Sequence, residues 1–177
     1  MAQKIPERLS WAVDQLKIAG DERLLEIGCG RGVAVSLICP LLTTGTITAI
    51  DRSEIAISAA RHRNKAHLAA GKVSFRHAAL EDLAGPARSF DKVFAINVNL
   101  FWLDAALGLD AVREMLAPDG MLFLFYEPPA RARRKQAEAK LLANLEVNHF
   151  EVLETIEADA SRSCLFGMLA KPMGNRA

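Results

Sequence analysis

The stretch Leu24-Leu-Glu-Ile-Gly-Cys-Gly-Arg-Gly32 decides the fold of this 177-residue chain. Residues 23–27 predict a buried strand, glycines follow it at alternate positions, and the apolar run that begins at Val33 predicts a helix. A strand that ends in glycines and opens into a helix brings bare backbone and a positive helix end close to a ligand. The alternative interpretation is a tight strand-to-helix turn that binds nothing.

Short β-rich runs alternate with longer helical stretches on both sides of this turn. Strands are expected at residues 23–27, 46–50, 73–76, 92–96, 121–126, 151–157 and 164–170, and helices at 6–19, 33–42, 53–70, 104–116 and 131–147. Strands separated by helices lie parallel, whereas the last two strands are close enough to form an antiparallel hairpin. The sequence therefore predicts a three-layer α/β sandwich with a mostly parallel seven-stranded sheet whose last strand is antiparallel.

Composition and charge exclude several classes of protein. Lys and Arg number 22 and Asp and Glu number 21, so the net charge of +1 excludes a surface tuned throughout to nucleic acid or an anionic membrane. Three cysteines without paired spacing make no disulfide framework, and the four histidines form no zinc spacing with them. No apolar run approaches the ~20 residues of a membrane helix. We expect a cytoplasmic protein without a metal.

An aspartate after the next strand narrows the class of ligand that the site could bind. Asp51 follows the next strand, and 51 − 28 = 23 residues separate it from Gly28. A carboxylate at this place can accept hydrogen bonds from both hydroxyls of a ribose. The alternatives are a solvated loop aspartate and a cap for the helix that begins at Ser53. Together the glycine turn and Asp51 favour a nucleoside site at the edge of the sheet.

The spacing of the glycines disfavours a dinucleotide. A dinucleotide fingerprint requires Gly-x-Gly-x-x-Gly, and here Val33 stands at the position of the last glycine. Glu26 precedes Gly28 by two residues, and its carboxylate would repel a pyrophosphate. An acid at this position suits a ligand that carries an ammonium or a sulfonium.

The chain resembles the class I S-adenosylmethionine-dependent methyltransferases, in particular the type 11-like small-molecule group. Glu26-x-Gly28-x-Gly30-x-Gly32 matches their first motif, and residues 49–53 resemble their ribose-binding strand end. Residues 89–97 are similar to the segment that enters their fourth strand, and residues 116–120 resemble the turn before their fifth. The resemblance covers residues 22–126. The length of the chain and the lack of a linker or internal repeat predict one domain over 1–177, divided into an N-terminal helix (1–20), a cofactor-binding half (21–126) and a C-terminal helix and hairpin (127–177).

The resemblance implies S-adenosyl-L-methionine as the cofactor and assigns residues to it. The methionine part would contact the backbone of the loop at Gly28, Cys29 and Gly30, and Glu26 would hold its amino end. Asp51 would bind the ribose, Arg52 would lie against the adenine plane, and Asn97 would face the methionine portion and the transferred methyl group. We expect Cys29 to fill the loop, because a nucleophile there would collide with the cofactor.

The adenine edge is the place where the chain departs from many relatives. Ala79 stands where they have an aspartate that contacts the adenine amine. Glu81 or Asp82 replaces that contact, or the backbone at Leu80 suffices.

We expect methyl transfer to an O, N or S atom of a small-molecule acceptor, which residues 97–102 would help to bind. No catalytic base is assigned, because no histidine–acid pair is evident. The basic stretch 131–140 is interpreted as a solvated helix face, with weak attraction of an anionic substrate or RNA as the alternative. Other hypotheses are a nicotinamide-dependent oxidoreductase and a non-catalytic cofactor-binding module. Acceptor identity and oligomeric state stay open.

Overall fold

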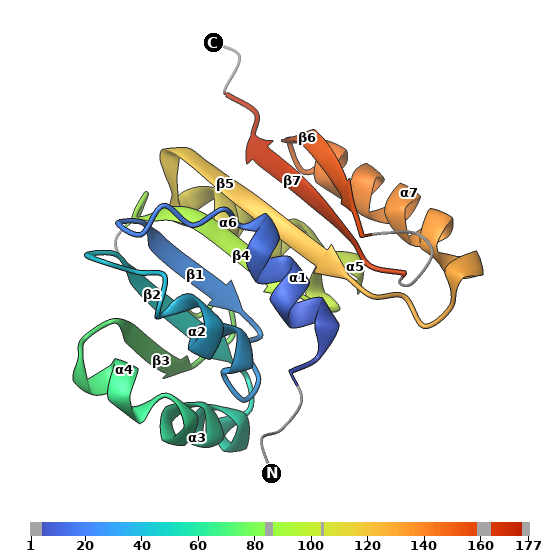
Figure 1. Cartoon of the computed structure of the whole chain (residues 1–177). Helices are drawn as coiled ribbons and strands as arrows, with labels where there is room; N and C mark the ends of the chain where they lie inside the picture. Colours follow the sequence, from blue (N-terminus) through green and yellow to red (C-terminus); the bar gives the residue numbers. More distant parts are fainter. Residues whose placement is uncertain (1–4, 84–86, 104, 159–163, 175–177) are drawn as a thin grey trace.

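Seven strands join one sheet in the order β3-β2-β1-β4-β5-β7-β6 (Figure 1). The computed structural model describes residues 5–83, 87–103, 105–158 and 164–174, without the side chains of Trp102 and Leu103. The strands are β1 Arg23–Ile27, β2 Thr46–Asp51, β3 Val73–His77, β4 Phe90–Ile96, β5 Leu116–Tyr126, β6 Phe150–Glu157 and β7 Phe166–Pro172. Strand β7 is antiparallel to both β5 and β6, and the pairs among β1 to β5 are parallel. The predicted fold class is confirmed.

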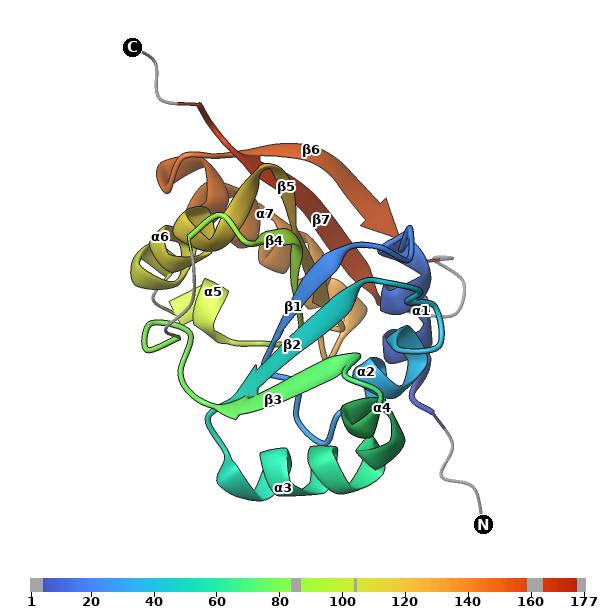
Figure 2. The same cartoon turned by 90° about the vertical axis from the view of Figure 1, so that its left-hand side faces the viewer.

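Helices cover both faces of the sheet (Figure 2). They are α1 Glu7–Gln15, α2 Val33–Ile38, α3 Glu54–Arg63, α4 Lys65–Ala69, α5 Leu100–Leu103, α6 Ala105–Met115 and α7 Arg131–Val147. Alternation along each strand sends its side chains to two cores. In β1, Leu25 packs with residues of α6 and α7, whereas Leu24 packs with residues of α1, α2 and α3. The chain thus forms three layers, as the sequence predicts.

Several helices differ from the predicted bounds. The predicted helix 53–70 is divided, because Asn64 leaves helical dihedrals (φ −105°, ψ 23°) and its buried side-chain amide donates to the carbonyls of Gly32 and Ala60. Helix α1 ends at Gln15 rather than 19, since Lys17 has a positive φ of 46°. Helix α2 ends at Ile38, two residues before Pro40. Residue 104, where a helix was expected to begin, lies outside the described residues.

The start of β5 differs most from the predicted strand bounds. Strand β5 begins at Leu116, whereas residues 116–120 were expected to form a turn before it. The ladder to β4 is interrupted there, because Phe90 pairs with Leu116 but Lys92 pairs with Met121. The predicted turn is therefore accommodated as an irregularity inside the strand.

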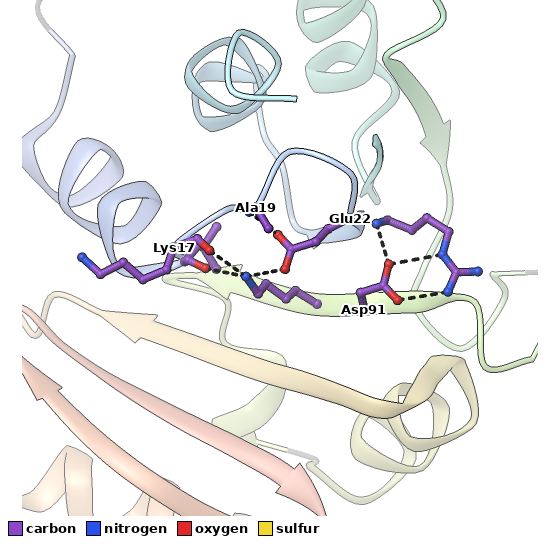
Figure 3. Close-up of polar contacts among 7 residues, drawn as sticks. Lys17, Ala19, Glu22 and Asp91 are labelled. Carbon is purple, nitrogen blue, oxygen red and sulfur yellow. Dashed lines mark hydrogen bonds and ion pairs between the residues drawn. The ribbon is translucent and has the colours of Figure 1, made fainter. Parts of the chain in front are cut away.

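A buried lysine ties the segment after α1 to the sheet (Figure 3). The ammonium of Lys92 donates to the carbonyls of Leu16 (2.8 Å) and Lys17 (3.0 Å) and pairs with Glu22 at 2.7 Å. Lys92 lies near the amino end of β4. Beside it, Asp91 accepts from Arg23, and the Arg23 guanidinium lowers the pKa of Asp91. This cluster holds the segment after α1 against the amino end of β4.

Candidate cofactor and acceptor site

The candidate site lies where the carboxyl ends of β1, β2 and β4 meet. Strand β1 pairs with β2 on one side and with β4 on the other, so the loops after these strands diverge at this edge. Ligands of open α/β sheets bind in the crevice at such a change of strand order. Figure 2 shows the ends of β1, β2 and β3 at one edge of the molecule.

The loop after β1 presents backbone rather than side chains. The amides of Gly28 and Cys29 both donate to the carbonyl of Ile50 at 2.9 Å, which holds the loop against the end of β2. Gly28 has a φ of 71°, and a Cβ added there would lie 2.6 Å from a methyl group of Val98. Gly30 also has a positive φ, of 53°, and a Cβ there would meet no atom of the described residues within 4 Å. The loop therefore needs glycine and leaves open space beside it.

Asp51 lies at the end of β2 with its carboxylate held from two sides. Its Oδ2 accepts from the Gly30 amide and its Oδ1 accepts from the Ser53 amide, both at 2.8 Å. Ser53 caps α3 as predicted, because its hydroxyl accepts from the Ala56 amide. Each carboxylate oxygen keeps a second lone pair, so Asp51 can still accept from two hydroxyl groups.

Glu26 is a buried acid directly before the glycine loop. Its side chain is 3% exposed, and its Oε2 has no hydrogen-bond partner among the described residues. Burial, followed by the charge of Asp51, raises the pKa of Glu26 to about 8. A buried unpaired carboxyl is costly to ionise, and a cationic group of a ligand would favour its charged form. This orphaned oxygen fits a ligand with an ammonium.

A pocket of about 480 Å³ opens beside these groups. Four of the nine residues assigned to the cofactor line it: Gly28, Asp51, Arg52 and Leu80. The other lining residues are Ile27, Ile50, Ala78, Glu81, Val98, Asn99, Leu100 and Leu107. The remaining predicted residues, Glu26, Cys29, Gly30, Ala79 and Asn97, lie outside its lining.

The far end of this pocket carries an ion pair. Arg52 and Glu81 both line the pocket, and their side chains approach to 2.6 Å. The carbonyl of Arg52 also contacts the ring of His77 at 3.0 Å. Glu81, one of the residues predicted to replace the aspartate contact to adenine, thus lines this pocket with Arg52 beside it. Leu107 was not predicted as a site residue: it lines the pocket and is 66% exposed, an unusual exposure for a leucine that no pattern in the sequence indicates.

A second pocket of about 630 Å³ adjoins the first, and Asn99 lines both. The residues that line it come from the ends of β4 and β5 and from α7: Asn97, Asn99, Tyr126, Glu127, Pro128, Pro129, Arg133, Gln136, Ala137 and Lys140. Asn97 lies here, and its Oδ1 accepts from the Glu127 amide at 2.7 Å. The Tyr126 hydroxyl donates to the carbonyl of Val98 at 2.9 Å. These bonds fix the segment between the two pockets.

The α7 residues of the second pocket were not predicted as site residues. Arg133, Gln136 and Lys140 follow a spacing of three and four, which places them on one face of the helix. That spacing was the available signal in the sequence. The stretch 131–140 was interpreted there as a solvated face, with weak attraction of an anionic substrate or RNA as the alternative.

Cys29 lies in the loop but is poorly suited to act as a nucleophile. Its side chain is buried, and desolvation, reinforced by Glu26 and Asp51, raises the pKa of its thiol well above the usual range. Within the described residues, no group of three His, Cys, Asp or Glu side chains lies close enough to hold a metal ion. Among the helices that the structure describes, none combines the length and apolarity needed to cross a membrane.

Comparisons with known proteins identify the family of this chain. Residues 24–120 match the family model described as "Methyltransferase domain". The putative methyltransferase YrhH of Bacillus subtilis is 27% identical over 153 residues, which cover 86% of this chain and 80% of YrhH. A ubiquinone biosynthesis O-methyltransferase of Methylocella silvestris is 34% identical over 103 residues, 57% of this chain and 38% of that protein. Overall, the chain spans between 32% and 80% of the length of four of the curated relatives it matches.

Solved structures give the same fold. A SAM-dependent methyltransferase from Aquifex aeolicus superposes with a TM-score of 0.75 at 16% identity, covering 92% of this chain and 88% of that one. At this identity the likeness establishes the fold, and the family rests on the sequence match over residues 24–120. The chain therefore belongs to the methyltransferase domain family and has the fold of solved S-adenosylmethionine-dependent methyltransferases.

Proposed function

We propose that the protein moves a methyl group from S-adenosylmethionine to an O, N or S atom of a small molecule, with the cofactor in the 480 Å³ pocket and the acceptor in the adjoining one. The observation that carries this proposal is the convergence of the bare Gly28–Gly30 backbone, the Asp51 carboxylate and the orphaned Glu26 oxygen at one edge of the sheet. The second pocket, which shares Asn99 with the first, supplies a place for the acceptor.

The residues present would hold the cofactor by charge and by shape. Glu26 would face the ammonium of the cofactor's methionine part near the glycine loop, because such a cation would favour the ionised form of the buried carboxyl. Asp51 would accept from the ribose hydroxyls with its two unused lone pairs. Leu80 and Leu107 would cover the adenine, with Arg52 and Glu81 at its polar edge.

Methyl transfer needs positioning more than acid–base chemistry. When bound, S-adenosylmethionine supplies an electrophilic methyl carbon: the acceptor's lone pair forms the new bond to it as the carbon–sulfur bond breaks, the bonding pair stays on sulfur, and the acceptor's proton passes to water. The protein would hold the two reactants near ~3–3.5 Å, an effect that can supply ~7–11 kcal/mol. Asn97 and Tyr126 would act in positioning, since their bonds to Glu127 and Val98 fix the wall between the pockets.

A small acceptor is supported by the size of the second pocket and by the name of one relative. About 630 Å³ is the volume of a small-molecule site. The Methylocella silvestris relative is named for O-methylation in ubiquinone biosynthesis, which is a small-molecule reaction. We extend the proposal to one domain over residues 1–177, since all seven strands share a sheet, and to the cytoplasm, where free thiols such as those of Cys29 and Cys39 persist.

Calorimetry with S-adenosylhomocysteine and with NAD tests the cofactor assignment. We expect saturable binding of S-adenosylhomocysteine and none of NAD, and binding of NAD alone would overturn the proposal. A metabolite extract incubated with methyl-labelled S-adenosylmethionine then tests catalysis. A labelled small molecule formed only with active protein supports methyl transfer, whereas cofactor binding without any labelled product favours a non-catalytic binding module.

A further inference from the structure

The second pocket, at the ends of β4 and β5, carries an excess of positive charge. Arg133 and Lys140 line it from α7, and neither has an ion-pair partner among the described residues. The neighbouring Arg134 differs, because it pairs with Glu138 at 2.6 Å and with Glu157 at 2.7 Å on the side of β6. The two lining cations therefore have their charge available to a bound molecule.

Glu127 is the acidic side chain in the lining of this pocket, and its charge is offset. Its Oε2 pairs with Arg8 of α1 at 3.4 Å. Counting Arg8, three cations stand against one anion around the pocket, so the local charge is 3 − 1 = +2. The first turn of α7 adds to the positive potential of the pocket, because the amino end of a 17-residue helix is positive and Ala130 offers no side-chain cap.

The other walls of the pocket suit the body of a small organic molecule. Tyr126, Pro128 and Pro129 form an apolar side, and Gln136 adds an amide between the two cations. Asn99 lies at the junction with the cofactor pocket. A molecule that places a negative group near α7 thus extends toward the place where the methyl group would be presented.

We infer that the acceptor is a small organic anion whose carboxylate or phosphate is bound by Arg133 and Lys140 and whose nucleophilic atom faces Asn99. This inference rests on the proposed function, because it assigns the acceptor of the same transfer. Two cations on one helix face can share one anionic group, with the guanidinium as a two-pronged donor and the ammonium as a point charge.

Binding to the 177-residue chain saturated with S-adenosylhomocysteine tests the inference. The probes are pairs that differ in charge: benzoate, 4-hydroxybenzoate, hexanoate and phenyl phosphate, each beside its neutral amide or alcohol. We expect anions to bind at least tenfold more tightly than their neutral partners, by NMR line broadening or calorimetry. The double variant R133Q/K140Q should abolish the preference. The matched double variant R131Q/K135Q removes the same charge from exposed α7 residues outside the pocket lining and should retain it.

Anion binding no tighter than that of the neutral partners, or equal binding by wild type and R133Q/K140Q, overturns the inference. S-adenosylhomocysteine binding is measured separately, and its absence would count against the proposed function instead. The labelled-extract assay gives a second reading of the acceptor. A methylated product retained on an anion exchanger supports an anionic acceptor, and a neutral or cationic product contradicts it.

Discussion

The backbone amide of Gly30 donates a 2.8 Å hydrogen bond to Oδ2 of Asp51, which joins the loop after β1 to the end of β2. The other carboxylate oxygen accepts from the Ser53 amide, so one side chain orders both a loop and the start of α3. Because Asp51 already holds the glycine loop, the loop needs little reorganisation when a ligand arrives. Such preorganisation lowers the entropy cost of binding.

Replacing Asp51 by Asn should weaken S-adenosylhomocysteine binding by about 10- to 100-fold, or ~1.5–3 kcal/mol. The asparagine side chain keeps one acceptor oxygen, but its NH₂ group faces a backbone amide that also donates. The substitution also removes the negative charge that would attract the ribose hydroxyls. Calorimetry measures the affinity. Asp119→Asn, an exposed aspartate in β5, is the matched control and should bind as wild type. Equal affinity in D51N and wild type would remove Asp51 from the site.

Gly28→Ala should abolish or strongly reduce cofactor binding while the sheet stays folded. Its Cβ would lie 2.6 Å from a Val98 methyl group, so Val98 must move in the lining of the same pocket. The positive φ of 71° adds a strain of about 1 kcal/mol. The measurement is calorimetry together with thermal unfolding.

Gly71→Ala separates the two effects in G28A. Gly71 has nearly the same φ, 70°, but a Cβ there would meet no described atom within 4 Å. G71A should therefore lose only the ~1 kcal/mol of backbone strain and bind S-adenosylhomocysteine normally, whereas G28A should lose more stability because Val98 must also move. Loss of binding in both variants would mean that backbone strain, rather than the contact with Val98, explains G28A.

Glu26→Gln should stabilise the ligand-free protein in a pH-dependent way. Burial raises the pKa of Glu26 from 4.5 to about 8, so the folded state favours the protonated carboxyl. The stability associated with that proton is full below pH 4.5 and is lost as the pH rises through 8. Glutamine carries no titrating group, so the advantage of E26Q should grow between pH 5 and 8, toward ~4 kcal/mol, and then level off. Urea unfolding at several pH values measures it.

For cofactor binding, E26Q should have the opposite effect: it stabilises the ligand-free protein but should weaken its affinity for the ligand. An ammonium near Glu26 favours the ionised carboxyl, so wild-type affinity for S-adenosylhomocysteine should rise between pH 6 and 8 more steeply than the affinity of E26Q. At pH 8 the variant should bind at least tenfold more weakly than wild type. Parallel pH profiles for the two proteins would show that Glu26 does not face the cationic group.

The sheet and the glycine loop could be predicted because their signals are local. The apolar run at β1, the glycines after it and Asp51 at the end of the next strand are read within about 30 residues of one another. The parallel order follows from the length of the crossovers. The assignment of individual residues to the cofactor stays a prediction.

The second pocket could not be predicted because its geometry depends on contacts distant in the sequence. Asn97 lines this pocket, and its Oδ1 accepts from the amide of Glu127, 30 residues later. Nothing near Asn97 in the sequence announces that partner. The division of the helix at Asn64 has the same origin, since its amide reaches Gly32, 32 residues earlier. Periodicity reports which face of an element is buried but not which distant carbonyl a side chain contacts.

Lys92→Met should destabilise the protein by ~2–4 kcal/mol and leave cofactor affinity in the folded state unchanged. The substitution strands the Glu22 carboxylate, whose side chain is 17% exposed, and removes the donor to the Leu16 and Lys17 carbonyls. Breaking one partner of a buried pair costs far more than breaking a surface pair. Lys171→Gln removes an exposed partner of Glu151 and should cost less than ~1 kcal/mol. Urea unfolding of both variants measures the difference, and E22Q in the K92M background should recover part of the loss because it removes the unpaired charge. Equal stability of K92M and K171Q would mean that the contacts in Figure 3 do not anchor α1.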